Sequence, residues 1–189
     1  MREAIRVDGF EAVFARDQDP WGTYARRDEA VKRQAILRAA GRTRGRALEL
    51  ACGNGSNTRA LRGRALRLLA LDGAPSAVRI TRQRAGGRRV EVREALLPTD
   101  APREPFDLIV IAEVLYYLRT DEIARLGRRL RLAPGGRLVL AHHHVDFPDT
   151  SSRPADVHGL LRSALVQRLE PVSLSRNARW RVEGLCAPR

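Results

Sequence analysis

A carboxylate followed closely by two glycines is the feature of this 189-residue sequence that most clearly predicts chemistry. Glu49 lies near the end of the strand-like run 46–50, and Gly53 and Gly55 follow it. Glycines let a chain turn sharply and approach a ligand closely, because they carry no side chain. Glu49 would repel a phosphate and attract an amino group. We therefore expect a nucleotide-type turn in which an amino group, rather than a phosphate, lies near Glu49.

A second carboxylate, Asp72, directly follows the next strand-like run, 66–71. Ligands of open α/β sheets lie beyond the carboxyl ends of the strands, so an acid here is placed to accept hydrogen bonds from both hydroxyls of a ribose. Asp72 before Gly73 also suits an ordinary turn. Thr58 stands where a dinucleotide fingerprint has its third glycine, which disfavours NAD and FAD.

The loop Glu49-Leu50-Ala51-Cys52-Gly53-Asn54-Gly55 resembles the E-x-G-C-G-x-G motif of class I S-adenosylmethionine-dependent methyltransferases. The resemblance implies S-adenosylmethionine as cofactor, with Glu49 near the methionine amino group, Gly53 and Gly55 beneath the methionine part, and Asp72 on the ribose. Ala51 replaces the first glycine of the motif. We expect this departure to be mild, because the position serves close packing more than ligand contact.

A more specific resemblance is to the nodulation protein S branch of that family, whose best-known members N-methylate a chitooligosaccharide. It is carried by 19–21 (Asp-Pro-Trp), by Glu29 and Lys32, and by the block FDLIVIAEVLYYL at 106–118. The resemblance runs from about Phe10 to the C-terminus. It implies methyl transfer to a small-molecule acceptor, first an amine, such as an amino sugar or a natural product, and next a hydroxyl.

The surrounding elements must position these residues. Strands are predicted at 46–50, 67–71, 90–93, 107–111 and 137–142, and helices at 57–62, 75–85, 121–132 and 154–167. Such alternation predicts a parallel sheet with right-handed crossovers. The runs 169–175 and 179–187 predict a hairpin that adds an antiparallel last strand. The fold class is α/β and Rossmann-like, and the family resemblance implies the strand order 3-2-1-4-5-7-6.

A single domain is predicted over 1–189, with 1–45 as a helical lid segment and 46–189 as the Rossmann-like core. The helix predicted at 29–40 has Val31 facing inward with Ile36 and Leu37. In class I methyltransferases such a segment lies over the cofactor. Trp21 then either covers the cofactor with its ring or fills the core beneath the lid.

Residues after the later strands complete the expected cofactor site. Ala95 and Leu96 follow the third strand as backbone and apolar contacts for adenine, with Glu94 as an alternative acid. The backbone of Ala112, after the fourth strand, is expected beneath the methionine part. The residues expected to bind the cofactor are Trp21, Glu49, Ala51, Gly53, Asn54, Gly55, Asp72, Gly73, Ala95, Leu96 and Ala112.

The acceptor side is expected after the fourth and fifth strands. Glu113 is predicted to start a helix, where the helix dipole favours an acid. Tyr116 and Tyr117 cannot both face the core, so one of them lines the methyl-transfer channel. We expect an acceptor wall and catalytic group made by His142, His158 and Tyr117, with Glu113 behind them.

Three of the four histidines of the chain occupy 142–144. Strand alternation places His142 and His144 on one face and His143 on the other. A histidine acting as general base would give activity that rises through a pKa near about 6.5. A structural role and metal binding by the His-x-His pair are the alternatives; no metal is predicted.

Charge and composition limit the remaining choices. The net charge is +13, and all but one of the 35 basic residues are arginine, so either a compositional bias or a polyanionic partner explains it. No apolar run has the length of a membrane span, and 1–10 lack the apolar core of a signal peptide, so no membrane and a cytoplasmic location are predicted. The alternatives are an O-methyltransferase, an RNA methyltransferase and a cofactor-binding regulatory subunit. Nucleic acid is the less favoured partner, and a homodimer is left open.

Overall fold

A seven-stranded sheet forms the centre of the molecule in the computed structural model, which describes residues 5–43, 45–145 and 148–189. The strand order is β3-β2-β1-β4-β5-β7-β6, and β7 runs antiparallel to both of its neighbours. The predicted α/β fold class, strand order and antiparallel last strand are confirmed. Residues 1–4 and 44 of the predicted lid segment lie outside the described residues.

The strands lie close to their predicted positions. They are β1 (Arg46–Leu50), β2 (Arg67–Asp72), β3 (Val90–Glu94), β4 (Phe106–Ala112), β5 (Leu132–His143), β6 (Glu170–Arg176) and β7 (Trp180–Cys186). The start of β5 differs from the prediction, since Leu132 already pairs with Phe106 across a local register shift.

The helices are α1 (Val7–Arg16), α2 (Arg27–Ala40), α3 (Ser56–Leu61), α4 (Pro75–Ala85), α5 (Thr120–Arg129) and α6 (Pro154–Ala164), with a 3-10 turn, η1 (Leu115–Tyr117). The predicted end of α5 at residue 132 is wrong. Leu130 takes an extended backbone, and the chain enters β5 directly.

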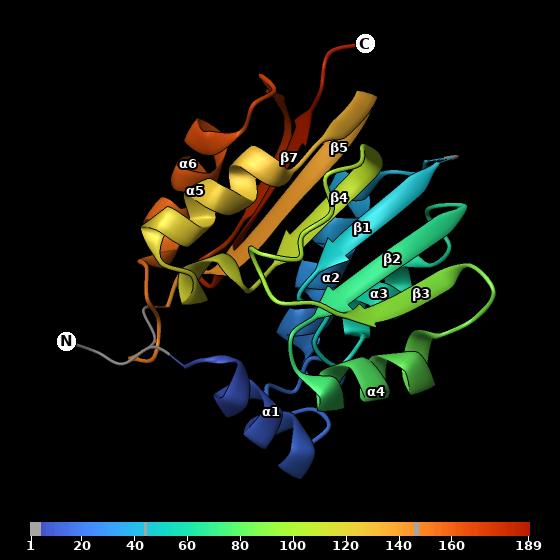
Figure 1. Ribbon diagram of the computed structural model, residues 1–189, viewed down its shortest axis with the longest axis vertical. Coiled ribbons are helices and arrows are strands. Elements are labelled where there is room, and N and C mark those ends of the chain that lie inside the picture. Colours follow the sequence, from blue (N-terminus) through green and yellow to red (C-terminus); the bar gives the residue numbers. More distant parts are fainter. Residues whose placement is uncertain (1–4, 44, 146–147) are drawn as a thin grey trace.

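Helices cover both faces of the sheet, with α5 and α6 in front of it and α2 behind it in Figure 1. Leu138 and Leu140 of β5 belong to the apolar cluster that includes residues of α5 and α6, whereas Val139 and Ala141 pack with α2. The alternation of β5 therefore directs residue 142 towards α6 and residue 143 towards α2. Val31, expected to face inward, is exposed on the outer side of α2.

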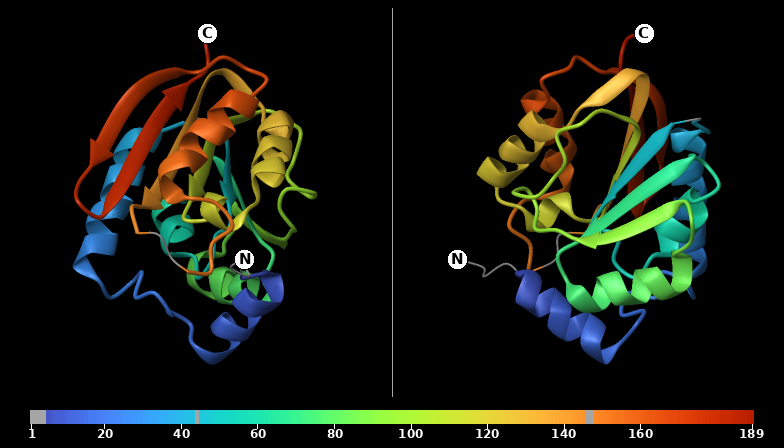
Figure 2. Two further views of the ribbon diagram at one scale, coloured as in Figure 1. Left: turned by 90° about the vertical axis from the view of Figure 1, so that its left-hand side faces the viewer. Right: turned by 45° about the vertical axis from the view of Figure 1, so that its right-hand side comes forward.

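The first helix lies beyond the strand ends, beside α4, in both views of Figure 2. Its buried Phe14 packs with Ala74, Ala77 and Ile80. The Glu11 carboxylate accepts hydrogen bonds from the backbone N and the hydroxyl of Ser76, at 2.8 and 2.7 Å. None of the helices formed by the described residues has the length and apolarity of a membrane span.

Candidate active site

The loop 51–55, which we call the glycine loop, leaves β1 through a series of left-handed residues. Gly53 and Gly55 have φ values of 54° and 82°, and Ala51 has a φ of 57°. The backbone of position 51 is in the region that favours glycine, which gives a reason for the glycine of the motif that the sequence did not show. The expectation that this position serves close packing more than ligand contact stays a prediction. An alanine there costs roughly 1 kcal/mol. The loop also lies close to its neighbours, since a Cβ on Gly55 would meet Thr81 at 3.0 Å.

Glu49 presents a buried carboxyl group beside this loop. Among the described residues its hydrogen-bond donor is the Thr58 hydroxyl, at 2.6 Å. Burial raises the pKa of Glu49 to about 8; the Thr58 hydrogen bond opposes this rise and the charge of Asp72 adds to it. An ammonium group next to Glu49 would favour the carboxylate and relieve the cost of burying it. The site therefore suits a cationic amino group.

Asp72 is held firmly by the backbone at the end of β2. Its Oδ2 accepts a hydrogen bond from the Gly53 N at 2.8 Å, and its Oδ1 accepts one from the Ala74 N at 3.0 Å. Each carboxylate oxygen has a second lone pair that can accept a hydrogen bond from a hydroxyl. Burial raises the pKa of Asp72, against the hydrogen bonds from the backbone. The carboxylate thus has the free acceptor positions and the fixed orientation that the two hydroxyls of a ribose require.

Asn54 ties the glycine loop to the segment between α1 and α2. Its Nδ2 donates to Asp19 Oδ1 at 2.7 Å, and the Thr23 hydroxyl donates to its Oδ1 at 3.0 Å. The Phe14 ring lies 3.5 Å from the position that a Cβ on Gly53 would occupy. Trp21 packs against that ring, with centroids 5.3 Å apart, and remains partly exposed. The segment thus covers the loop through aromatic rings and through Asn54.

The end of β3 brings apolar groups to the same edge. Ala95 is buried, and its N donates to the backbone O of Asp72 at 2.8 Å. The half-exposed Leu96 side chain lies 3.3 Å from the position of a Cβ on Gly73. Glu94 is exposed. Leu96 and Gly73 form a small apolar strip beside Asp72.

Glu113 forms a second acidic centre, directly after β4. The prediction that it starts a helix is wrong: its φ is 58°, and η1 begins two residues later. Its N donates to the backbone O of Ala141 at 2.9 Å. The carboxylate accepts hydrogen bonds from the Tyr116 hydroxyl at 2.7 Å and from the backbone N of His143 at 3.1 Å. Tertiary contacts, rather than a helix dipole, therefore fix this acid.

The side chains of Glu29, Lys32, Glu113 and His143 form a connected polar group, which we call the α2 network. Lys32 Nζ lies 2.5 Å from Glu113 Oε1 and 3.0 Å from Glu29 Oε1. His143 Nε2 lies 3.0 Å from Lys32 Nζ and 2.9 Å from Glu29 Oε1. The sequence pointed to Glu29 and Lys32 only through the family resemblance. A further signal was available, because Lys32 is the only lysine of the chain.

Opposing influences set the pKa values in the α2 network. Burial acts to raise the pKa of Glu113, but the charges of Lys32 and His143 outweigh it, and the pKa is lowered. Burial also lowers the pKa of His143, more than Glu113 raises it. At neutral pH, Glu113 is therefore a carboxylate and His143 a neutral imidazole.

Comparison with known proteins identifies relatives of this chain. A family model described as a methyltransferase domain matches residues 48–138. Nodulation protein S of Rhizobium tropici is 36% identical over an alignment of 152 residues, and the alignment covers 72% of this chain and 63% of that protein. The N-methyltransferase NodS of Bradyrhizobium japonicum WM9, solved in complex with S-adenosyl-L-homocysteine, has a TM-score of 0.80 at 25% identity, covering 97% of this chain and 98% of that chain. The chain belongs to the class I methyltransferases.

Another solved relative of this chain is described as a putative methyltransferase from Pseudomonas syringae. It is 29% identical with a TM-score of 0.69, covering 85% of this chain and 99% of that chain. The chain spans about three fifths of the length of the curated relatives it matches.

The opposite face of β5 carries a different group, formed by His142, His158 and Glu183, which we call the α6 cluster. The rings of His142 and His158 lie 4.2 Å apart, which confirms the predicted approach of His158 to His142. His158 Nδ1 lies 3.2 Å from Glu183 Oε2, and Arg162 binds the other oxygen of Glu183 at 3.0 Å. His142 and His144 share this face, as predicted.

Burial dominates the chemistry of the α6 cluster. His142 is 3% exposed, and burial, followed by the charge of His158, lowers its pKa to about 3. The expected pKa near about 6.5 is therefore wrong for His142. Tyr117 lies elsewhere, half-buried against the Phe10 ring at 4.8 Å, while Tyr116 is buried. The assignment of His142, His158 and Tyr117 to an acceptor wall stays a prediction.

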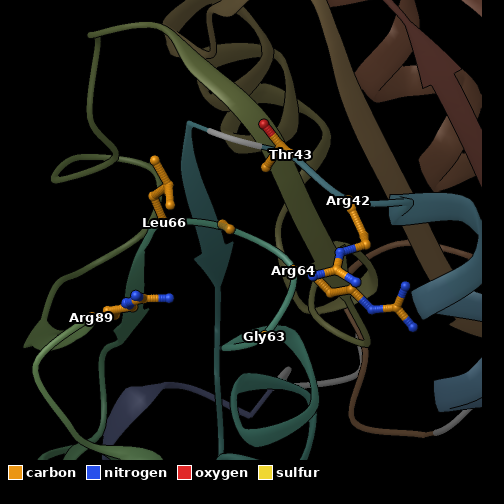
Figure 3. A pocket seen from close by; sticks show the side chains of 7 residues that line it. Arg42, Thr43, Gly63, Arg64, Leu66 and Arg89 are labelled. Carbon is orange, nitrogen blue, oxygen red and sulfur yellow. The ribbon is translucent and has the colours of Figure 1, made fainter.

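A cavity of about 430 Å³ lies at the other end of the strands, away from the glycine loop. Figure 3 shows that its lining comes from the segments preceding β1, β2 and β3. The lining residues are Arg42, Thr43, Gly63, Arg64, Ala65, Leu66 and Arg89. Within residues 5–43, 45–145 and 148–189, no group of three or more His, Cys, Asp or Glu side chains is placed to hold a metal ion.

Proposed function

We propose that this chain transfers the methyl group of S-adenosylmethionine to an amine of a small-molecule acceptor, with amino sugars as the first candidate class. The observation that carries the proposal is the pair of carboxylates on the glycine loop. Glu49 is buried with a pKa raised to about 8, which suits a cationic amino group, and the backbone orients both oxygens of Asp72. An aminoacyl tail joined to a ribose matches this pair.

We assign to the cofactor-binding residues the roles expected from the sequence. Glu49 holds the methionine ammonium group, and Asp72 accepts hydrogen bonds from the ribose hydroxyls. Gly53, Gly55 and the backbone of Ala51 and Ala112 allow the methionine part to approach closely. The apolar strip beside Asp72, with Ala95, borders the adenine. Asn54 fastens the covering segment, and Trp21 and its neighbouring rings exclude water.

The bound sulfonium supplies an already activated methyl group, so the protein has mainly to orient a nucleophile in line with it. Such positioning supplies up to about 7–11 kcal/mol in favourable cases. The relative solved with S-adenosyl-L-homocysteine is named an N-methyltransferase, and this favours an amine over a hydroxyl as the acceptor. A homodimer, a cytoplasmic location and an absence of nucleic-acid partners stay predictions.

Calorimetry with S-adenosyl-L-homocysteine tests cofactor binding. Asp72→Ala is expected to weaken binding by about 1.5–3 kcal/mol, the range for hydrogen bonds to a charged group. Glu91→Gln is the control, because the Glu91 side chain is exposed on β3. Native affinity in a folded Asp72→Ala protein would contradict the ribose assignment, and no binding to the wild type would contradict the proposed function.

A transfer assay tests the acceptor. Radiolabelled S-adenosylmethionine is offered with a glucosamine oligomer, with the fully N-acetylated oligomer of the same length, and with bulk RNA. The two sugars share their ring hydroxyls, so labelling of the glucosamine oligomer alone identifies an amine acceptor. Labelling of both sugars would indicate a hydroxyl, and site-specific labelling of RNA would favour the RNA methyltransferase.

A further inference from the structure

We propose that the α2 network receives the acceptor amine: Glu113 holds the incoming ammonium group, His143 takes its proton, and Glu29 and Lys32 position the two. This inference rests on the proposed function. It moves the acceptor-binding and proton-accepting groups from the α6 face of β5 to the α2 face.

The strand register places the α2 network at the edge of the sheet that carries the glycine loop. Leu50 of β1 pairs with Ile111 of β4, and Ala112 pairs with Ala141 of β5. Glu113 follows that register by one residue, and His143 is the last residue of β5. The network therefore lies beyond the carboxyl ends of the central strands, where ligands of open α/β sheets bind.

Exposure gives the network an open end and a closed end. The side chains of Glu113 and His143 are 25% and 21% exposed, whereas those of Lys32 and Glu29 are 4% and 10% exposed. An acceptor arriving from solvent therefore reaches Glu113 and His143 first. Lys32 and Glu29 hold these two side chains in place from behind.

The charge of the network suits an ammonium group. Two carboxylates and one ammonium, with neutral His143, leave one negative charge in a largely buried place. A proton on His143 would bring the total to zero, with Nε2 2.9 Å from Glu29 Oε1 and 3.8 Å from Glu113 Oε1. The charge of Asp28 also favours the protonated form of His143, while that of Lys32 opposes it. The net charge of the network is thus zero when His143 is protonated.

The backbone of Glu113 is a second, independent observation. A glutamate with φ of 58° is strained, and such strain persists only where the surroundings hold it. Here the backbone O of Ala141, the Tyr116 hydroxyl and the backbone N of His143 hold it. The left-handed turn brings the carboxylate onto Lys32 and the end of β5. Residues held in this way cluster at functional sites.

The proton and electron balance of the step is simple. An N–H bond of the acceptor ammonium breaks, and its proton goes to the imidazole of His143. The freed nitrogen lone pair then forms a bond to the methyl carbon, while the C–S bond breaks and its electron pair stays on sulfur as a thioether. The methylated amine leaves as an ammonium, and His143 loses its proton to solvent.

The test is transfer to the glucosamine oligomer by wild type and variants, with S-adenosyl-L-homocysteine affinity measured on each. His143→Gln is expected to lower kcat about 100-fold, the lower range for a general base. Glu113→Gln is expected to raise KM for the oligomer about tenfold, as a charged hydrogen bond is lost. Cofactor affinity stays within twofold in both variants. His144→Gln, an exposed histidine on the other face, is the matched control and keeps its activity.

Lys32→Gln separates positioning from simple support. Because the charge of Lys32 lowers the pKa of His143, its loss raises that pKa, and the acidic limb of the kcat profile moves to higher pH. A purely structural Lys32 would lower the amount of folded protein and leave the limb in place. If that variant does not fold, Glu29→Gln is used instead, and the limb moves to lower pH.

The outcomes separate the two proposals. A wild type that binds no S-adenosyl-L-homocysteine overturns the proposed function. A wild type that binds S-adenosyl-L-homocysteine but methylates the glucosamine and N-acetylated oligomers equally well overturns the amine site. So does a wild type that binds it and methylates neither oligomer. The amine site is also overturned if His143→Gln keeps the wild-type kcat and Glu113→Gln keeps the wild-type KM for the oligomer.

Discussion

Two neighbouring histidines at the end of β5 belong to opposite chemical settings. His142 joins the α6 cluster, in which the side chains of His158 and Glu183 are both 5% exposed. His143 joins the α2 network, in which the side chains of Glu113 and His143 are 25% and 21% exposed. Each group combines histidine with glutamate and a basic residue. The difference is in access, so the face of the strand decides which histidine can meet an acceptor.

The two groups also depend differently on their basic residues, and this gives the largest expected effect. Lys32 is buried between two carboxylates, so Lys32→Met is expected to destabilise the protein by about 3–5 kcal/mol, because it leaves uncompensated buried charge. Arg162 binds Glu183 from a partly exposed position, so Arg162→Met is expected to cost less than about 1 kcal/mol. Urea unfolding of both variants measures the difference.

The double variant Glu29→Gln/Lys32→Met is the control for this comparison. It removes one charge of each sign, so it should recover part of the stability lost in Lys32→Met. Equal losses of stability in Lys32→Met and Arg162→Met would show that the two groups depend on their basic residues to the same degree.

The α6 cluster predicts a second effect, on the pH dependence of stability. His142 has a pKa of about 3 in the folded protein, below its ordinary value of 6.5, so the unfolded chain binds the extra proton between these values. Stability therefore rises with pH over this window and is lost as pH falls. Between pH 6.5 and 5, His142 alone accounts for up to about 2 kcal/mol.

Urea unfolding at pH 5 and at pH 7 checks this prediction. The loss between the two pH values should be smaller in His142→Asn than in the wild type, whatever the absolute stability of the variant. An identical loss of stability in both proteins would mean that His142 has its ordinary pKa in the folded state.

The backbone strain at the two strand ends predicts the smallest effect. Ala51 and Glu113 both have left-handed backbones after neighbouring parallel strands, but Glu113 uses the turn to place its carboxylate in the α2 network. Ala51→Gly relieves the strain but adds backbone freedom to the unfolded chain, so it should stabilise the protein by at most about 1 kcal/mol. Glu113→Gly relieves the same strain but loses the ion pair with Lys32, so it should not stabilise the protein. Thermal unfolding of the two variants compares them, and a destabilised Ala51→Gly would contradict the strain assignment.

Local sequence patterns were sufficient for most of the fold. Apolar runs, turn residues and the family resemblance predicted the strand order and the glycine loop with Glu49 and Asp72. Residues 132–136 were missed because one proline and two glycines in a row are typical of a turn, whereas Leu132 pairs with Phe106 across the sheet. That pairing joins residues from different parts of the chain and leaves no local periodic signal.

The acceptor side was harder to predict for the same physical reason. Glu29 lies one helical turn from Lys32, but its other partners, Glu113 and His143, lie 81 and 111 residues away in the chain. Most of the α2 network therefore leaves no local pattern in the sequence. Glu113 takes its backbone conformation from contacts with β5 and Tyr116, which a helix-start signal cannot represent. The alternation of histidines was predicted correctly, but the burial of one face could not be read from their spacing.

The most direct test is a nitrogen NMR titration of His142, His143 and His158 in the complex with S-adenosyl-L-homocysteine, with and without the glucosamine oligomer. Our account predicts that the oligomer shifts the resonances and the pKa of His143, that the N-acetylated oligomer does not, and that His142 stays neutral below pH 5. A response of His142 or His158 to the oligomer, with His143 unchanged, would place the acceptor on the α6 face and contradict it.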